Sequence, residues 1–531
     1  MKKSTFRLLV AILSIAICVS VSLSGCAVQH DNSIVISLGS EPNSLDPAIS
    51  LTTDARSYIT CMFEGLLNLD ESGNLIDGAA DEWSANSTNT EYKFHIREDA
   101  HWSNGEKLVA EDFLYAWLRV LAPETASGWA SFLYYIKNAA AYNAGECTAE
   151  EVGVIAEDNY LTVKMESPCA FFASMTAIQP YFPVYAKSIE ENGAAWSNHA
   201  NSLISNGAFK LKQWNHDNNI VIESNKYYWD RDKIKTNEIR FDLLENASVA
   251  INAYEAGQLF YLENILTVNE MAQIDDVEVD DYTVTKFLSL NFRREKFFDK
   301  RVREAITIAL DREQLSVLIG DGATPLCSFI PYGFTNSTLQ MDFRKDGISP
   351  EKYVQSTAEL GRARELLLQA GYSNSNQLEL DYLTNTSSQN VALAEIVKSQ
   401  LSKVGIKVNI IALESKVFND RRVLRDFDIV ASSWAAEYPD ISSYLYGFQA
   451  SDFNNYANYD NAEYDALYKL LVQDNSAERF NYIHQAEDLI MEDVAAIPLF
   501  SKNKTFISQN GIKGYYHDIT GCAIFRYVWK G

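Results

Sequence analysis

The side chains of this chain that could perform acid–base chemistry are mostly carboxylates. The 531 residues include 71 Asp and Glu against 45 Lys and Arg. No local spacing marks a catalytic pair among them, and the motifs HExxH, GxSxG and GxxxxGK are absent. Gly320-Asp321-Gly322 lacks the third glycine of a dinucleotide fingerprint. We therefore predict a protein that is not an enzyme, with a secreted hydrolase as the less favoured alternative.

Cysteine and histidine do not form a metal-binding pattern, so no metal and no cofactor are predicted. The histidines are scattered, and no two cysteines have CxxC spacing. An odd number of cysteines follows Cys26, so at least one thiol is unpaired or bonded to another molecule. Their state is left open by the sequence; they are Cys61, Cys147, Cys169, Cys327 and Cys522.

The first 26 residues have the layout of a secretory signal. Three basic residues precede an apolar run from residue 8 to 21, which is shorter than the ~20 residues that a membrane-spanning helix needs. Leu23-Ser24-Gly25-Cys26 resembles the lipobox of bacterial lipoproteins. This resemblance implies that residues 1–25 are removed and that Cys26 carries the lipid. It predicts a body anchored to the outer face of a bacterial cell membrane.

The net charge limits the partners of the chain. A formal charge of −26 repels nucleic acid and anionic lipid headgroups, so no nucleic-acid partner is expected. Solubility at a surface accounts for such a charge. Net charge alone does not place a charge in a binding pocket.

Apolar periodicity predicts secondary structure in both halves of the chain. Residues 34–38 form a short apolar run suited to a buried strand, and residues 92–96 alternate as a half-buried strand does. A helix is predicted over 110–121. The region 301–319 is predicted as a single helix closed by Gly320.

A helix, glycine and strand pattern continues toward the C-terminus. Residues 360–370 and 391–404 predict helices closed by glycine, and residues 406–411 and 427–431 predict strands. This alternation indicates an α/β lobe. After the second strand, Ser432-Ser433-Trp434 lead into a polar turn at 437–440. Loops that leave the carboxyl ends of strands are the usual place for ligands in such sheets.

Several motifs, in their order and spacing, resemble one family. The chain is similar to the extracytoplasmic solute-binding proteins of family 5, and most similar to the oligopeptide-binding members that serve peptide ABC importers. The likeness covers nearly all residues after Cys26. The motifs are residues 39–47 (GSEPNSLDP), 63–67 (FEGLL), 94–105 (FHIREDAHWSNG), 206–209 (NGAF), 299–305 (DKRVREA), 370–372 (AGY), 427–429 (FDI) and 434–440 (WAAEYPD).

The resemblance implies a two-lobed α/β fold of the periplasmic-binding-protein type (cluster C), with an extra domain and a cleft that closes about a hinge. Lobe I is then assembled from three segments, so the chain crosses the hinge twice, which suits rigid-body closure. The implied division is lobe I at 27–63, 191–283 and 500–531, the extra domain II at 64–190, and lobe III at 284–499.

The resemblance also implies how a ligand is held. An extended oligopeptide would bond to protein backbone as an added strand, so its side chains need only fit roomy pockets. The matching backbone positions are Leu51, Thr52 and Thr53 on one side, and Ser433, Trp434 and Ala435 on the other.

The charged ends of a peptide need partners of opposite charge. The family position for the peptide ammonium carries Glu437 here in place of Asp, so the carboxylate reaches one methylene further. Of three cationic positions for the carboxylate end, Arg422 keeps its charge, whereas Ala431 and Asn390 do not. The partner of the peptide carboxylate is therefore open.

Trp434 and Trp129 match aromatic positions that line the cleft in the family, although a core position is an equal alternative for each. The resemblance implies a monomeric receptor that delivers oligopeptides to an ABC permease. A dipeptide, a metal chelate, haem or an oligosaccharide is the alternative solute, because this fold takes several ligands. The sequence leaves open the length and sequence preference of the peptide. It also leaves open whether the protein takes up nutrients or captures signalling peptides.

Overall fold

The computed structural model describes residues 33–531 except 40, 43, 51–52, 264–273, 275–276, 321–322, 337–340, 347–351, 437, 453, 475 and 519. Four predicted functional residues, Cys26, Leu51, Thr52 and Glu437, therefore lie outside the described residues. Thr53 begins helix α2 (Thr53–Met62). None of the helices within the described ranges combines the length and apolar character that crossing a membrane requires.

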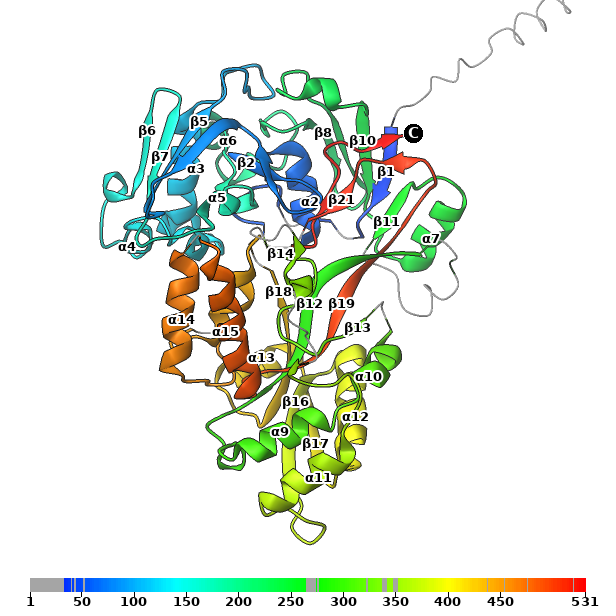
Figure 1. The fold of residues 1–531 in the computed structure, drawn as a ribbon. Coiled ribbons are helices and arrows are strands. Elements are labelled where there is room, and N and C mark those ends of the chain that lie inside the picture. The colour runs from blue at the N-terminus through cyan, green and yellow to red at the C-terminus, as the bar shows by residue number, and fades with distance from the viewer. Residues whose placement is uncertain are drawn as a thin grey trace, which may run out of the picture.

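The molecule has two lobes, one above the other in Figure 1. We call residues 33–263 and 504–531 the upper lobe, and residues 284–502 the lower lobe. Each has its own large hydrophobic core: one gathers residues between Ile34 and Tyr261 with residues between Phe506 and Val528, the other residues between Phe287 and Phe500. Two lobes and mixed helices and sheets agree with the predicted fold class. The predicted domain boundaries stay a prediction.

A single mixed sheet of 11 strands runs through both lobes. Strand β13 (Thr324–Pro325) pairs with β19 off the main path. The other strands, in spatial order, are β17 (Lys407–Leu413), β16 (Glu379–Asn385), β18 (Ile429–Ala435), β12 (Val277–Leu290), β19 (Ile497–Ser508), β11 (Tyr261–Glu263), β1 (Ser33–Ser37), β10 (Glu238–Asp242), β9 (Asn219–Ser224) and β8 (Phe209–Asn215).

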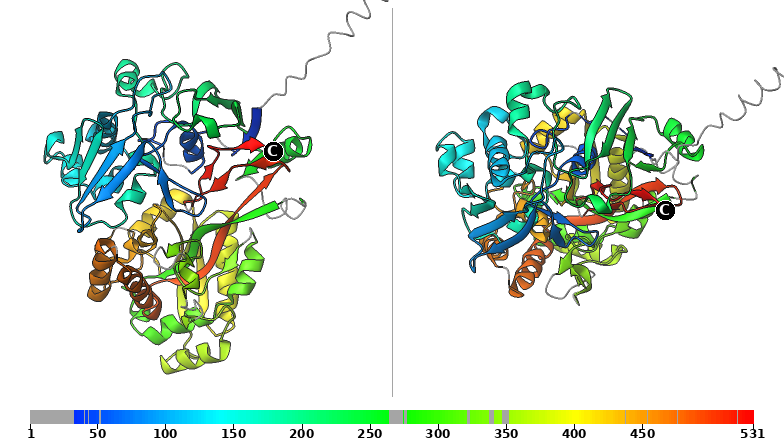
Figure 2. Two further views of the ribbon diagram at one scale, coloured as in Figure 1. Left: turned by 45° about the horizontal axis from the view of Figure 1, so that its top comes forward. Right: turned by 90° about the horizontal axis from the view of Figure 1, so that it is seen from above.

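Strands β12 and β19 cross from one lobe to the other (Figures 1 and 2). Their antiparallel register is interrupted between the pairs Asp280↔Lys504 and Val284↔Lys502. Between these two pairs, β12 has three residues whereas β19 has only one. Such an irregularity bends the ladder locally, so this pair of strands is a natural place for a hinge.

The upper lobe contains a second, four-stranded sheet with the order β4-β5-β7-β6. Its strands are β4 (Ala80–Ala85), β5 (Glu91–Ile96), β6 (Val154–Glu157) and β7 (Tyr160–Lys164). Four two-stranded sheets complete the strands: β2 (Leu67–Leu69) with β3 (Leu75–Asp77), β14 (Thr335–Asn336) with β15 (Met341–Asp342), β20 (Ile512–Lys513) with β23 (Trp529–Lys530), and β21 (Tyr516–His517) with β22 (Ala523–Ile524).

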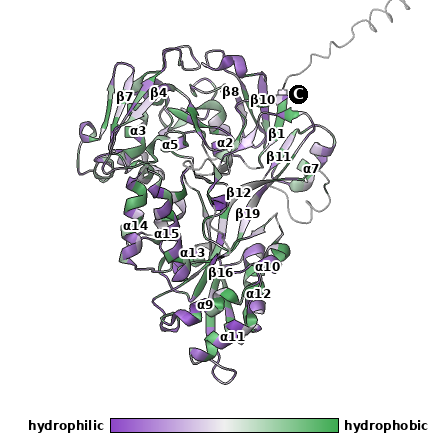
Figure 3. Cartoon of the chain, in the orientation of Figure 1, coloured by the Kyte–Doolittle hydropathy of each residue, from purple (hydrophilic) through white to green (hydrophobic). Residues whose placement is uncertain are grey.

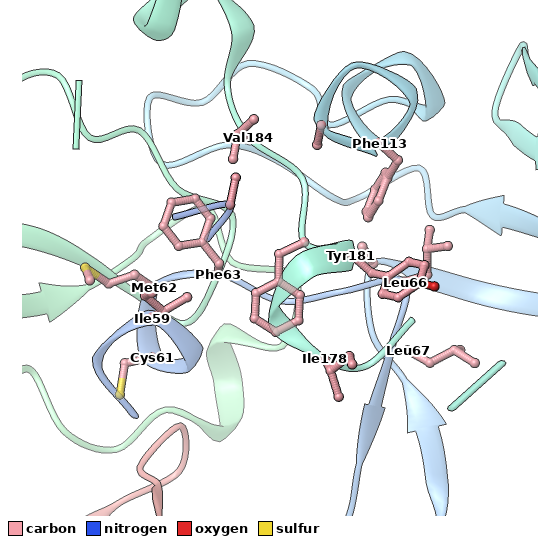
Figure 4. Close-up of a cluster of buried hydrophobic side chains, with 14 of the residues drawn as sticks. Ile59, Cys61, Met62, Phe63, Leu66, Leu67, Phe113, Ile178, Tyr181 and Val184 are labelled. Carbon is pink, nitrogen blue, oxygen red and sulfur yellow. The ribbon is translucent and has the colours of Figure 1, made fainter. Parts of the chain in front are cut away.

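The upper core joins α2 to the predicted extra domain. Figure 4 shows Met62 and Phe63, at the end of α2, in one buried cluster with Phe113 and Tyr181 from the segment predicted as domain II. All four side chains are fully buried. The helices of this lobe are α3 (Ala110–Leu121), α4 (Ala139–Asn143), α5 (Phe172–Met175), α6 (Ala186–Asn192) and α7 (Ala247–Glu255).

The lower-lobe helices carry both hydrophobic and hydrophilic residues, as helices packed on a sheet do (Figure 3). They are α9 (Lys300–Ile308), α10 (Arg312–Ile319), α11 (Leu360–Gln369), α12 (Ser388–Ser402), α13 (Ser415–Val423), α14 (Ala462–Gln473) and α15 (Glu478–Glu492). The prediction of a single helix over 301–319 is wrong. Asp311 accepts a hydrogen bond from the Gln314 N–H and so starts the second helix, α10.

Candidate functional site

The two lobes meet along a line of aromatic side chains centred on Tyr438. This residue belongs to the lower-lobe segment after β18, yet it is buried in the upper core. Its ring stacks on Phe171 with 5.1 Å between centroids and lies edge-on to Phe132 at 6.5 Å. The Ala170 N–H donates to the Val472 carbonyl at 3.0 Å. These contacts bring the segment after β18 against the upper lobe.

Beside Tyr438, residues of both lobes line an open cavity of about 450 Å³. This volume is typical of a small-molecule site. Four aromatic side chains and one carboxylate stand among its walls, which are Gly128, Ser131, Phe132 and Tyr135 of the upper lobe, and Tyr438, Tyr446, Asp452 and Asn454 of the lower lobe. We call it the interlobe cavity.

The two predicted tryptophans stand behind the walls of this cavity. Trp129 Nε1 donates to the Ser50 carbonyl at 2.7 Å, and its ring packs edge-on against Phe132 at 5.0 Å. Trp434 Nε1 donates to the Ser443 carbonyl at 2.6 Å, and its ring packs edge-on against Tyr446 at 5.1 Å. Each half-buried indole is therefore locked by a hydrogen bond and supports a wall residue. Their direct contact with a ligand stays a prediction.

Ser433, Trp434 and Ala435 are not in a loop, which corrects the prediction that the strand ends at residue 431. They continue β18 and pair with Lys286, Thr285 and Val284 of β12. Sequence periodicity missed this extension because the pairing is with a strand far away in the chain. On its other edge, β18 pairs with β16 at Ile429 and Val430. β16 ends at Asn385, which this register places opposite Ser432, and among the described residues no strand pairs with the edge from Ser433 to Ala435.

Asp452 is a wall residue that the sequence reasoning did not single out. Burial raises the pKa of its carboxyl, although the Asn454 N–H donates to it at 2.7 Å. No cation among the residues that the structure describes pairs with this half-buried carboxylate. A carboxylate in such a position favours a ligand that brings a positive charge. No sequence signal marked it, because Asp452 lies in a polar loop.

Arg422, at the end of α13, is half-buried beside two aromatic rings. Its guanidinium carbon lies 4.8 Å from the centroid of Tyr456 and 5.4 Å from that of Phe418. Its buried Nε has no hydrogen-bond partner. The alternative for Arg422 was an ion pair with a surface acid, but no Asp or Glu in the described ranges pairs with it.

Asn390 and Ala431, the two uncharged positions, are also in the lower lobe. Asn390 lies in the first turn of α12 and donates to Asn385 Oδ1 at 2.9 Å. Ala431 is half-buried on β18. Among the described residues, no three His, Cys, Asp or Glu side chains gather as a metal site. No disulfide joins any two of the five cysteines after Cys26, and burial raises the pKa of the Cys61 and Cys522 thiols to about 12.

Comparisons with known proteins agree with one another. The family model of the bacterial extracellular solute-binding proteins, family 5 Middle, matches residues 74–456. The dipeptide-binding protein DppE of Bacillus subtilis is 28% identical, over 98% of each chain.

Two solved structures differ in how well they superpose. The unliganded open form of the murein tripeptide binding protein MppA covers 94% of this chain and 97% of its own, with 28% identity and a TM-score of 0.81. The Haemophilus influenzae oligopeptide-binding protein OppA in complex with the peptide RPPGFSPFR covers 94% and 99%, also with 28% identity, but with a TM-score of 0.72.

Proposed function

Because the chain belongs to family 5 of the bacterial extracellular solute-binding proteins, we propose that it is the peptide-binding receptor of an ABC importer. It takes a short extended peptide between its lobes and presents the closed, loaded form to the permease. It performs no reaction on the peptide. The names of its relatives, which include dipeptide-binding, murein tripeptide-binding and oligopeptide-binding proteins, support this ligand class.

The open edge of β18 is the observation that carries the proposal. From Ser433 to Ala435, no strand among the described residues pairs with this edge, and the segment leads directly to the interlobe line at Tyr438. An extended peptide can pair with such an edge through backbone groups that every peptide has. Side-chain preference is then weak. Ser433 and Ala435 contribute backbone, whereas Leu51, Thr52 and Thr53 are the proposed partners on the upper lobe.

Two carboxylates are available for the peptide ammonium. Glu437 holds the position that the family resemblance indicates, and Asp452 is the unpaired carboxylate in the wall of the interlobe cavity. Both belong to the segment that follows β18. Either carboxylate would stabilise an ammonium ion by its charge, and an ammonium ion at Asp452 would remove the cost of leaving that group half-buried without a counter-ion.

Closure of the lobes about β12 and β19 would complete the site. The higher TM-score against the unliganded open form of MppA than against the peptide-bound OppA, at equal identity and equal coverage of this chain, supports an open arrangement of the lobes. A ligand that contacts both lobes only when they are closed stabilises the closed arrangement through those additional contacts. The irregular register near Val284 is where these strands would bend.

Calorimetry with the full-length protein in detergent tests the receptor and its ammonium site. Peptides of two to ten residues are titrated free and N-acetylated, and mass spectrometry identifies any peptide that co-purifies. Acetylation should weaken binding about tenfold or more, the scale of one buried charge interaction. Glu437→Gln and Asp452→Asn then show which carboxylate is responsible, since its loss makes the protein insensitive to acetylation.

Glu365→Gln is the matched control, because Glu365 is exposed on α11 at the far end of the lower lobe. It should bind as the unchanged protein does. If no peptide binds, the receptor proposal is wrong, and oligosaccharides, metal chelates and haem become the ligands to test.

The membrane anchor is a separate part of the proposal. Cys26 lies seven residues before Ser33, where β1 begins at the outer side of the upper lobe next to the C-terminus (Figure 1). A lipid on Cys26 would hold the protein at the membrane by that lobe. Cys26→Ser should release the protein into the medium and abolish incorporation of labelled palmitate. A variant that stays in the membrane fraction would contradict the anchor.

A further inference from the structure

We propose that Lys286, together with Arg422, forms a carboxylate-binding site at the upper end of the lower lobe, and that this site recognises a carboxylate of the bound peptide. The inference rests on the proposed peptide-binding function and deepens it. Lys286 was not among the predicted site residues, and it supplies a cation near the positions where Asn390 and Ala431 carry none.

Strand register places Lys286 beside the open edge of β18. Lys286 of β12 is paired with Ser433 of β18, so the two side chains share one face of the sheet. Val284, two residues earlier on β12, is paired with Lys502 of β19, which brings that lysine to the same face. The Lys286 Nζ donates to Ser433 Oγ at 3.2 Å. A peptide strand along this edge would therefore run past the Lys286 ammonium.

Helix α12 closes the site from below. Lys286 Nζ lies 3.5 Å from Asn390 Oδ1, in the first turn of this 15-residue helix. Free backbone N–H groups and the helix dipole make such a turn favourable to an anion. Two neutral side-chain oxygens are thus the recorded partners of the Lys286 ammonium, and the nearby helix end adds positive potential.

Neither Lys286 nor Arg422 is neutralised within the part of the chain that the structure describes. No carboxylate there pairs with Lys286 or with Arg422. Burial, followed by the charges of Lys502 and Arg422, lowers the pKa of Lys286 to about 8. A half-buried cation beside other cations is costly unless an anion joins it. A bound carboxylate would remove this cost and raise the pKa of Lys286 again.

The site is open to a ligand. Ser433 and Lys502 are exposed, while Lys286 and Arg422 are half-buried. A peptide offers two kinds of carboxylate, its C-terminal group and an acidic side chain. Either fits the same chemistry, because a lysine ammonium and an arginine guanidinium both bind carboxylate through charge-assisted hydrogen bonds.

A double-mutant cycle between protein and peptide tests the site. The full-length protein and its Lys286→Met variant are titrated with one bound peptide in three forms: unmodified, C-terminally amidated, and with each acidic side chain replaced by its amide. Lys286→Met keeps the length of the side chain but removes its charge. Loss of a charge-assisted contact predicts a Kd about tenfold or more higher for the unmodified peptide.

The peptide form that becomes insensitive to Lys286→Met identifies the carboxylate. If amidation of the C-terminus removes the effect, the C-terminal group occupies the site; if a side-chain amide removes it, an acidic residue does. Lys398→Met is the control, because Lys398 lies further along α12, where it pairs with Glu395 at 3.5 Å. It should leave every Kd unchanged.

Proton uptake gives a second readout that loss of folding cannot imitate. At pH 8, in buffers of different ionisation enthalpy, binding should take up a proton in the unchanged protein, because a carboxylate restores the charge of Lys286. The Lys286→Met variant should take up less. The groups around Lys286 that also bear on its charge are Lys502 of β19 and Arg422 of α13, with the neutral Ser433 of β18 and Asn390 of α12.

The outcomes separate this inference from the function on which it rests. If the unchanged protein binds no peptide, the proposed function is wrong. If it binds peptides, but Lys286→Met leaves all three peptide forms and the proton uptake unchanged, the carboxylate site alone is wrong.

Discussion

Charged side chains in the interior of the two lobes and those at the interlobe face are held in opposite ways. In the upper lobe, the buried Glu263 is bonded to Lys504 and His517, and these partners overcome the effect of burial and lower the pKa of Glu263 to about 2. In the lower lobe, Arg344 and Glu487 form a fully buried ion pair. At the interlobe face, burial raises the pKa of Asp452, whereas it lowers that of Lys286.

This difference separates structural charge from charge kept for a ligand. A buried charge with a partner is stable in the folded protein alone, whereas one without a partner costs free energy until something binds. If the comparison holds, removing a paired charge should destabilise the protein strongly. Removing an unpaired one should leave stability unchanged or raise it, and the loss should appear in binding.

The largest expected effect is that of Arg344→Met. Glu487 Oε1 would remain buried with two backbone donors, Phe329 N and Ile330 N, at 3.0 and 2.8 Å, but without its counter-ion. An uncompensated buried charge of this kind costs about 3–5 kcal/mol. Urea unfolding at pH 7 measures the loss. Adding Glu487→Gln should recover part of it, because the amide oxygen still accepts both N–H groups without a charge; no recovery would contradict the explanation.

The packing of Trp434 gives the next largest effect. A Cβ added at Gly447 would lie 2.2 Å from Trp434 Cη2, and the indole cannot move away without breaking its hydrogen bond to Ser443. Gly447→Ala should therefore destabilise the protein by about 1–3 kcal/mol, the usual cost of overpacking. Gly361→Ala, where a Cβ meets no atom within 4 Å, should not destabilise it. Equal unfolding midpoints for the two variants would show that the indole is free to move.

Lys286→Met should raise stability at neutral pH, in contrast to Arg344→Met. The folded-state pKa of Lys286, about 8, lies below the ordinary value of about 10.4. Its charged form therefore costs folding free energy, fully below pH 8 and progressively less as the pH rises toward 10. Because the side chain is half-buried, we expect a gain of on the order of 1 kcal/mol at pH 7 that shrinks by pH 10. Unfolding in urea at both pH values checks the sign.

Local elements were more predictable than the site. The helix at Ala110–Leu121 agrees with its predicted bounds, and β1 and β5 fall on the predicted strands, because periodicity and the following proline or glycine are local signals. The break at Asp311 was missed, since apolar residues continue on both sides of it and the capping hydrogen bond depends on a single side chain.

The site depends on contacts between distant segments. Lys286 was not singled out in the sequence. Only the pairing of β12 with β18 and β19 places it opposite Ser433 and on the same face as Lys502, which is paired with Val284. Asp452 became notable because Phe132 and Tyr135, more than 300 residues earlier, close the cavity around it. The local sequence therefore indicates neither the neighbours of Lys286 nor those of Asp452.

The smallest expected effect is that of Asp452→Asn on stability. The raised pKa of Asp452 means that its charge costs folding free energy above the folded-state pKa, and that this cost is absent below the ordinary value of about 3.9. The amide keeps an oxygen that can accept from the Asn454 N–H. We expect a gain of about a few tenths of a kcal/mol at pH 7 that vanishes near pH 3.5, measured by urea unfolding. A clear loss at pH 7 would mean that Asp452 is a structural charge like Glu263, which would leave Glu437 as the carboxylate for the peptide ammonium.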